Sequence, residues 1–275
     1  MGKIYLQMYS FMDGKHNDTR ESIRLASEMG YDGVELFGAN FDVPAEEMKE
    51  LLDKYGLDAV SMHVPDTDTL EDFIPYAKTV GARFIGISME PMKDEEAVHA
   101  WARRLNKFGE SCKKEGLTMI YHNHTQEFAP CGDARIIDVL LDETDPELVS
   151  FELDAGWCAA AGADPIEHVK RYSGRIKLLH VKESEKVIGA MPYLDFNGFE
   201  KDENGRPILP QEVRDMLAEA KKINCAACEG LVDWKKMTEA ADANGCCAHI
   251  VERESDHGDR IEELKNDIKR YREVM

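Results

Sequence analysis

One module recurs along this chain: an amphipathic helical segment, a glycine, and then a short apolar run. The glycines suit the left-handed residue that ends a helix, and they are Gly30, Gly56, Gly81, Gly116, Gly174 and Gly245. With two further runs, this pattern predicts eight strands, at residues 4–8, 33–37, 59–64, 83–88, 117–124, 149–154, 176–182 and 248–252. Strands that alternate with helices in this way predict parallel βαβ units.

Eight such units in 275 residues favour a single (β/α)8 TIM barrel that spans residues 1–275. An open, doubly wound sheet is the competing architecture. It would often carry a glycine-rich phosphate loop after an early strand, and the sequence contains neither GxGxxG nor GxxxxGK[ST]. Helix starts are indicated at Asp18, Pro44 and Pro165.

One segment departs from this rhythm. Residues 183–224 form a long polar stretch after the seventh strand, too long for an ordinary βα loop. We predict that this inserted segment covers the barrel mouth as a lid. A solvated excursion or a partner-binding surface is the alternative.

Side chains able to bind a metal or transfer protons stand where several of the predicted strands end. The run that ends in Tyr-His-Asn-His is the clearest case, because the period of two puts His122 and His124 on one face of a strand. The carboxyl ends of barrel strands form the active face. Imidazole and carboxylate ligands together suit Mn²⁺, Zn²⁺, Co²⁺ or a similar ion. The residues placed there are His63, His122, His124, Asp154, His180 and Glu252.

Three motifs carry a resemblance to a known family. They are Tyr121-His122-Asn123-His124 with Glu127-Phe128, Glu152-Leu153-Asp154-Ala155-Gly156-Trp157, and His180-Val181-Lys182. With them the chain resembles the sugar phosphate isomerase/epimerase group of the xylose isomerase-like TIM barrels.

The resemblance implies one divalent metal ion, with manganese first and zinc, cobalt or magnesium as alternatives. By position its ligands are His122, Asp154, His180 and Glu252. Many members of the group have a glutamate in place of His122. Glu127 is therefore the alternative ligand from the fifth strand.

The expected reaction starts with the ion polarising the carbonyl of a keto sugar or polyol, which makes the neighbouring C–H more acidic and stabilises an ene-diolate. His124 is the expected base, because an imidazole titrates near neutral pH. Glu127 is expected to assist as an acid–base partner or to orient His124. Lys182 is expected to hold a hydroxyl, a phosphate or a developing oxyanion. We expect the sugar pocket to be lined by Glu35, His63 and Trp157.

The same constellation serves more than one reaction. Return of the proton to another carbon or face makes the protein an isomerase or epimerase. Expulsion of a β-substituent makes it a lyase or hydratase that acts on keto sugars or oxidised glycosides, C-glycosides included. A non-catalytic partner subunit is a further alternative, since a fold alone does not guarantee an activity.

The charge of the chain constrains its partners. A net charge of −20 argues against nucleic acid and anionic membranes, which need a basic surface. It also disfavours an apurinic endonuclease, an activity known on a related barrel. The seven cysteines, an odd number, and the lack of a signal-like apolar start fit a cytoplasmic protein. We expect a small sugar as substrate, no membrane partner, and either a homo-oligomer or a partner subunit.

Overall fold

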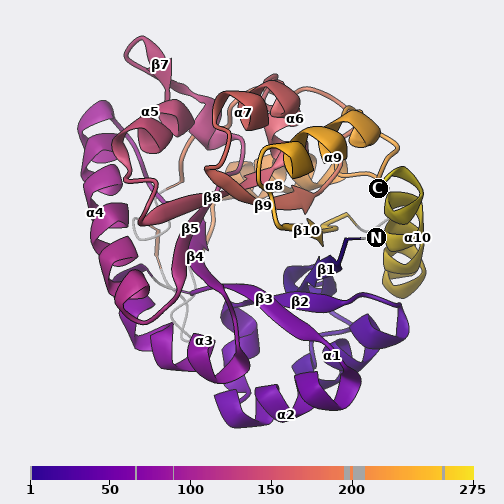
Figure 1. Cartoon of the computed structure of the whole chain (residues 1–275). Coiled ribbons are helices and arrows are strands. Elements are labelled where there is room, and N and C mark those ends of the chain that lie inside the picture. The colour runs from indigo at the N-terminus through magenta and orange to yellow at the C-terminus, as the bar shows by residue number, and fades with distance from the viewer. Residues whose placement is uncertain (1, 66, 89, 195–198, 201–207, 256–257) are drawn as a thin grey trace.

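The computed structural model describes residues 2–65, 67–88, 90–194, 199–200, 208–255 and 258–275. Its parallel strands close into a barrel in the order β1-β10-β9-β8-β5-β4-β3-β2 (Figure 1). Their bounds are Ile4–Gln7 (β1), Gly33–Phe37 (β2), Asp58–His63 (β3), Phe84–Ser88 (β4), Thr118–His122 (β5), Val149–Asp154 (β8), Ile176–Val181 (β9) and Ala248–Val251 (β10). The predicted (β/α)8 barrel is confirmed, with small shifts at the strand ends.

Helices surround the barrel as an outer ring (Figure 1). Their bounds are Thr19–Glu28 (α1), Ala45–Tyr55 (α2), Ile74–Val80 (α3), Glu95–Lys114 (α4), Ile136–Glu143 (α5), Ala155–Ala160 (α6), Pro165–Arg171 (α7), Gln211–Lys222 (α8), Trp234–Ala243 (α9) and Arg260–Val274 (α10). The predicted helix signals have visible causes. Asp18 accepts the backbone N–H groups of Arg20 and Glu21 at the start of α1. Gly56 ends α2 with a φ of 68°, which a residue with a Cβ rarely adopts.

Short elements fill the connections between strands and helices. They are the 3₁₀ turns Met8–Phe11 (η1), Gly38–Asp42 (η2), Thr67–Phe73 (η3) and Gln126–Phe128 (η4), and the strands Pro130–Cys131 (β6) and Ala134–Arg135 (β7), which form an antiparallel pair. Turns η1 and η2 directly follow β1 and β2, and η4 begins four residues after the end of β5.

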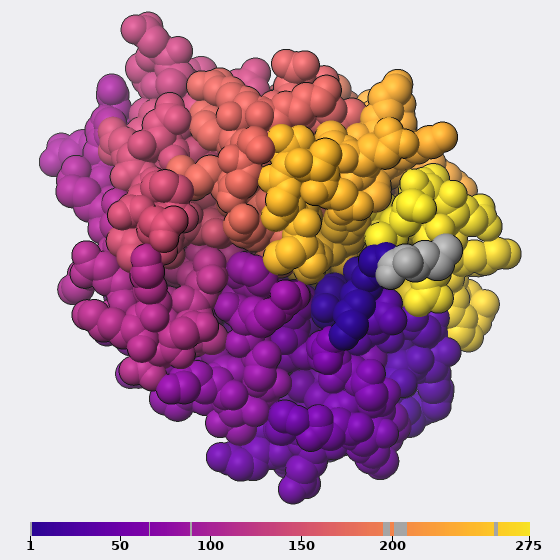
Figure 2. Space-filling model, in the orientation of Figure 1, coloured from indigo at the N-terminus to yellow at the C-terminus, as the bar shows by residue number. Residues whose placement is uncertain are grey.

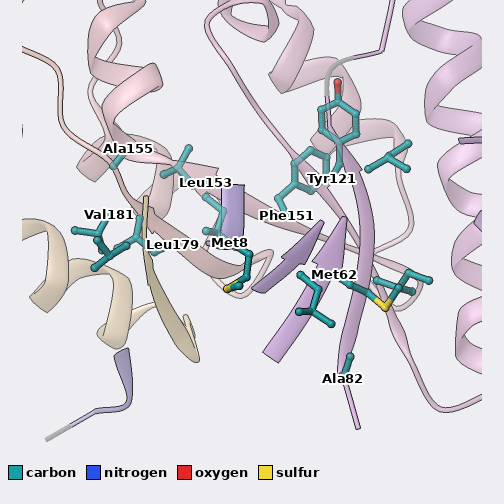
Figure 3. Packing of buried hydrophobic residues seen from close by; sticks show 14 of the residues in the cluster. Met8, Met62, Ala82, Tyr121, Phe151, Leu153, Ala155, Leu179 and Val181 are labelled. Atoms are coloured by element: carbon teal, nitrogen blue, oxygen red, sulfur yellow. The ribbon is translucent and has the colours of Figure 1, made fainter. Parts of the chain in front are cut away.

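The core has two parts because side chains alternate along each strand. One face of the strands packs against the helices, and Figure 3 shows part of this packing, including Tyr121, Phe151 and Leu153. The other face fills the lower barrel interior with a separate apolar cluster. Its members are Tyr5, Val60, Phe84, Ile120, Leu178, Ala248 and Ile250. Inward-facing residues further along the same strands therefore lie nearer to the barrel mouth.

The barrel closes where the two ends of the chain meet. Strand β1 pairs in parallel with β10, with Tyr5 opposite Ile250. Figure 2 shows the N-terminal and C-terminal segments side by side on one face of the molecule. None of the helices in the described ranges is both long and apolar enough to cross a membrane.

The predicted inserted segment leaves the barrel after β9. Its two ends lie together, because Ser184 forms an antiparallel bridge with Asn224. Helix α8 occupies much of its second half. Residues 195–198 and 201–207 of this segment lie outside the described residues. That this segment is an insertion, and that it acts as a lid, stay predictions.

Candidate metal centre and active site

Two imidazoles and two carboxylates meet at the carboxyl ends of four adjacent strands. His122 ends β5, Asp154 ends β8, His180 is near the end of β9, and Glu252 follows β10. All four are buried, and each offers a ligand atom within 4.8 Å of the others. The structure thus brings together the four residues that the resemblance implies as metal ligands.

The two imidazole rings present opposite edges to two different sets of carboxylates. Nε2 of His122 and Nδ1 of His180 each lie 4.0 Å from Oδ2 of Asp154. Nδ1 of His180 is also 3.1 Å from Glu252. Separations of this order suit nitrogen and oxygen atoms that share one ion.

Asp154 provides a direct test of whether a metal fits. Its Oδ1 accepts the backbone N–H of Trp157 at 2.7 Å and so caps α6. Its Oδ2 is buried without a hydrogen-bond partner among the described residues. Burial raises the pKa of Asp154 to about 7. A buried carboxylate oxygen is rarely left without a partner, and a cation at this point satisfies it. The residues present therefore fit a divalent ion.

A second layer of carboxylates lies on the far edges of the imidazoles. Oε2 of Glu152 is 2.6 Å from Nε2 of His63 and 3.1 Å from Nδ1 of His122. Oε2 of Glu35 is 2.7 Å from Nε2 of His180. Carboxylates that accept from the free nitrogen of a metal-binding histidine fix its tautomer and ring orientation. Glu35, expected in the pocket lining, is fully buried here and supports His180 instead.

A second grouping of possible ligands consists of His63, His122, Glu152 and His180. Its contacts are hydrogen bonds of ordinary length, and Oε2 of Glu152 is shared by the three imidazoles at 2.6–3.3 Å. Oε1 of Glu152 and Oδ2 of Asp154 are both buried without a hydrogen-bond partner among the described residues. The two groupings differ in that Glu152 already contacts three imidazoles through its Oε2, whereas no ring nitrogen of His122 or His180 lies closer than 4.0 Å to Oδ2 of Asp154.

His124 and Trp157 lie beside the metal cluster. The ring centroid of His124 is 5.0 Å from that of His122 and 6.2 Å from that of Trp157. Burial, together with the charge of Lys182, lowers the pKa of His124 to about 4, so the ring is neutral at pH 7. Nδ1 of His124 and the indole N–H of Trp157 have no hydrogen-bond partner among the described residues. Both side chains line the cavity described below.

Lys182 is a buried cation that faces carboxylates. Its ammonium group is 3.3 Å from Oε2 of Glu252, bonds Glu254, and lies 4.5 Å from the centroid of the Trp157 ring. Burial alone would lower its pKa, but attraction to Glu252 and Glu254 raises it. Lys182 is 1% exposed and is not part of the cavity lining. It offsets the negative charge around the site rather than contacting the cavity.

Glu127 points away from the metal cluster. Its Oε1 accepts the hydroxyls of Tyr121 at 2.8 Å and Tyr193 at 2.9 Å, and its Oε2 accepts the backbone N–H of His124 at 2.8 Å. These contacts use both oxygens, so His122 is the ligand candidate from β5. The contact with the backbone of His124 is shown, and that Glu127 orients His124 stays a prediction.

The site opens into a cavity of about 590 Å³ at the barrel mouth. The predicted residues His63, His122, His124, Trp157, His180 and Glu252 line it. Met191, Leu217 and Lys221 from the inserted segment line it as well.

A comparison with protein families places this arrangement among known folds. Residues 23–274 match the family described as the xylose isomerase-like TIM barrel. The chain belongs to this family. The matched residues include the four strands β5, β8, β9 and β10, at whose carboxyl ends the metal-ligand candidates lie.

Individual members of the xylose isomerase-like family resemble the chain at low identity. An inosose dehydratase of Clostridium perfringens is 27% identical over 199 residues, which cover 63% of this chain and 66% of that protein, just under two thirds. A sugar phosphate isomerase/epimerase of Parabacteroides distasonis has the same fold, with a TM-score of 0.74, 22% identity, and coverage of 98% and 93% of the two chains. The IOLI protein, whose crystal structure carries a zinc atom, gives a TM-score of 0.66 at 13% identity, with coverage of 99% and 96%.

Several residues of the site within this xylose isomerase-like barrel were not predicted. Glu152 is one, although a charged residue two positions before Asp154 on an inward strand face was a usable signal. Asn123 is another: its Oδ1 accepts the backbone N–H of Asp154 at 3.1 Å and ties β5 to β8. Glu254, which bonds Lys182, lies after the last strand, where sequence periodicity gives no direction.

Proposed function

We propose that this protein is a divalent-metal-dependent enzyme that moves a proton at the carbon next to the carbonyl of a keto sugar or keto polyol. The unpartnered Oδ2 of Asp154, set among His122, His180 and Glu252, is the observation that carries the proposal. The neutral imidazole of His124 beside this cluster supports it, since a base must stand near the polarised carbonyl.

His122, Asp154, His180 and Glu252 would hold the ion. Two nitrogen and two carboxylate ligands suit Mn²⁺, Zn²⁺ or Co²⁺ better than Mg²⁺, which prefers oxygen. The zinc atom of the IOLI structure also favours a transition metal. When bound, the ion supplies a Lewis acid that polarises the substrate carbonyl.

The remaining residues position the substrate and move the proton. His124 accepts the proton from carbon, because its pKa of about 4 keeps a lone pair free at neutral pH. The unpartnered indole N–H of Trp157 donates to a substrate oxygen. Lys182 balances the negative charge of the neighbouring carboxylates. Together with burial, its positive charge also keeps His124 neutral.

The fate of the abstracted proton decides the reaction class. Its return to another carbon or face gives an isomerase or epimerase, which we place first. Loss of a β-hydroxyl gives a dehydratase, and the likeness to an inosose dehydratase favours this second candidate. The described residues that line the cavity include no arginine, which supports a substrate without a phosphate group.

The proposal is tested by proton exchange. The metal-loaded protein is incubated in D₂O with a panel of keto sugars and keto cyclitols, and NMR follows deuterium at the carbon next to the carbonyl. We expect exchange in the parent and in His99→Gln, a variant of a histidine on α4 outside the cavity, and none in His124→Gln. New sugar isomers identify an isomerase, whereas loss of water identifies a dehydratase. Absence of exchange from every member of the panel, with metal bound and the protein folded, contradicts the proposal.

A further inference from the structure

We propose that the natural substrate carries a large apolar substituent, such as an aromatic aglycone, on its sugar or cyclitol ring. The proposal rests on the proposed function, since the metal cluster and His124 would take the ring. The apolar substituent would occupy the outer part of the same cavity, which we call the outer chamber. It is formed by Tyr9, Phe37, Val64, Pro65, Met191 and Leu217.

Burial separates the cavity into two zones. The polar residues at its inner end, His122, His180 and Glu252, are at most 8% exposed. Most residues of the outer chamber are half-buried, Pro65 is exposed, and Val64 alone is buried. The polar groups thus form the floor, and the apolar groups form the walls nearer to solvent.

The walls of the outer chamber come from two parts of the chain that face the same space. Tyr9 of η1 and Phe37 at the end of β2 pack edge to face with ring centroids 5.4 Å apart. The other part of the walls is formed by Met191 and Leu217 from the inserted segment. A contact joins the two parts, because the Lys221 ammonium lies 5.5 Å from the Tyr9 ring and 3.4 Å from its hydroxyl.

The chemistry of the outer chamber favours an apolar occupant over a second sugar. Val64, Pro65 and Leu217 offer no side-chain donor or acceptor. Thr125, which also lines the cavity, already accepts the backbone N–H of Met191 with its hydroxyl at 3.2 Å. The Tyr9 hydroxyl and the Lys221 ammonium, which also line the cavity, contact each other. A second sugar would therefore compete with that contact or leave hydroxyls without partners, which costs free energy on binding. An aromatic ring instead gains from contact with Tyr9 and Phe37.

The size of the cavity agrees with an extended ligand. A volume of about 590 Å³ lies within the range of sites for drug-sized molecules, roughly 300–1,000 Å³. A single sugar ring held at the metal cluster fills only the inner part. The substrate class that fits the whole cavity is therefore an oxidised glycoside or a substituted keto cyclitol.

The test compares two ligands that differ only in the substituent. Methyl and phenyl 3-keto-β-D-glucoside are titrated into the metal-loaded protein by calorimetry. We expect the phenyl compound to bind about tenfold tighter or more, because its ring is removed from water. Leu217→Ala and Phe37→Ala should reduce this preference at least about threefold. Leu231→Ala makes the same change at a residue that is 42% exposed and outside the cavity lining, and it should leave the preference unchanged.

Metal content and melting temperature of each variant show that it is folded and loaded. Equal affinity for both ligands, lack of binding by either, or the same preference in all four proteins overturns the proposal. Deuterium exchange without a preference for the phenyl compound would contradict the role given to the outer chamber but would support the proposed function. A preference for the phenyl compound without exchange would contradict the proposed function alone.

Discussion

Glu152 and His122 are joined across the imidazole edge that faces away from Asp154, with 3.1 Å between Oε2 of the glutamate and Nδ1 of the histidine. This contact leaves Nε2 of His122 on the side of Asp154. The pair resembles the carboxylate–histidine arrangement that orients metal ligands in many proteins. It places Glu152 behind the ligands rather than among them.

The first prediction concerns this supporting role. Glu152→Gln should weaken metal affinity roughly 10- to 100-fold without abolishing binding, because the imidazoles keep their positions but lose a charged acceptor. Competition with a fluorescent chelator measures the affinity. Glu147→Gln, with a side chain that is 81% exposed, is the matched control and should bind as the parent does. If Glu152→Gln and His63→Gln lose metal as completely as Asp154→Asn, the ion belongs to the other grouping of ligands.

The second prediction concerns the buried cation. Lys182→Met should lower the free energy of unfolding of the metal-free protein by about 3–5 kcal/mol, because Glu252 and Glu254 lose their partner. The metal-loaded protein should lose less, since the ion also neutralises this negative charge. Urea unfolding with and without metal measures both values. An equal loss in the two states would show that Lys182 and the ion do not compensate the same carboxylates.

The third prediction concerns the link between the inserted segment and the barrel. Tyr193→Phe removes the hydroxyl that Glu127 accepts, so the segment should be cleaved faster in limited proteolysis. Tyr76→Phe removes a hydroxyl that donates to the carbonyl of Val43, and it should not change cleavage of the segment. A parental cleavage rate in Tyr193→Phe would mean that the hydrogen bond does not restrain the segment. Slower cleavage of the segment in the parent with bound ligand would support the prediction that the segment is a lid.

The fourth prediction concerns pH. Burial lowers the pKa of His168 on α7, where it packs against Phe128 and Tyr172. The unfolded chain then binds a proton that the folded protein does not, so this group costs stability as pH falls below the ordinary histidine pKa of about 6.5. Urea midpoints at pH 7 and pH 5 should differ less in His168→Gln than in the parent. An unchanged difference would show that His168 does not contribute.

Much of the fold could be predicted from the sequence because its signals are local and repeated. Glycines such as Gly56 and caps such as Asp18 mark helix ends, and each apolar run has the length of a strand. The ligand candidates also followed, since parallel strands bring their carboxyl ends to one place. His122 and Asp154 could be chosen in this way.

Other features depend on directions that one sequence does not contain. Glu127 lies in the 3₁₀ turn η4 and contacts Tyr121 and Tyr193, and residue spacing does not give the direction of a side chain in such a turn. The apolar outer chamber combines η1 with α8, which are far apart in the sequence. The sequence predicts that Glu35 lines the cavity, whereas the structure places it behind His180, to which it is hydrogen-bonded.

Metal content of the protein and of two aspartate variants tests the central claim most directly. Asp154→Asn removes a charge from the proposed site but keeps an oxygen that can cap α6, and Asp164→Asn makes the same change at the cap of α7. Each protein is incubated with Mn²⁺ or Zn²⁺, desalted and analysed by plasma mass spectrometry. The account predicts about one equivalent of metal in the parent and in Asp164→Asn, and little in Asp154→Asn. Equal metal in all three proteins, or none in a folded parent, would contradict a metal centre at Asp154.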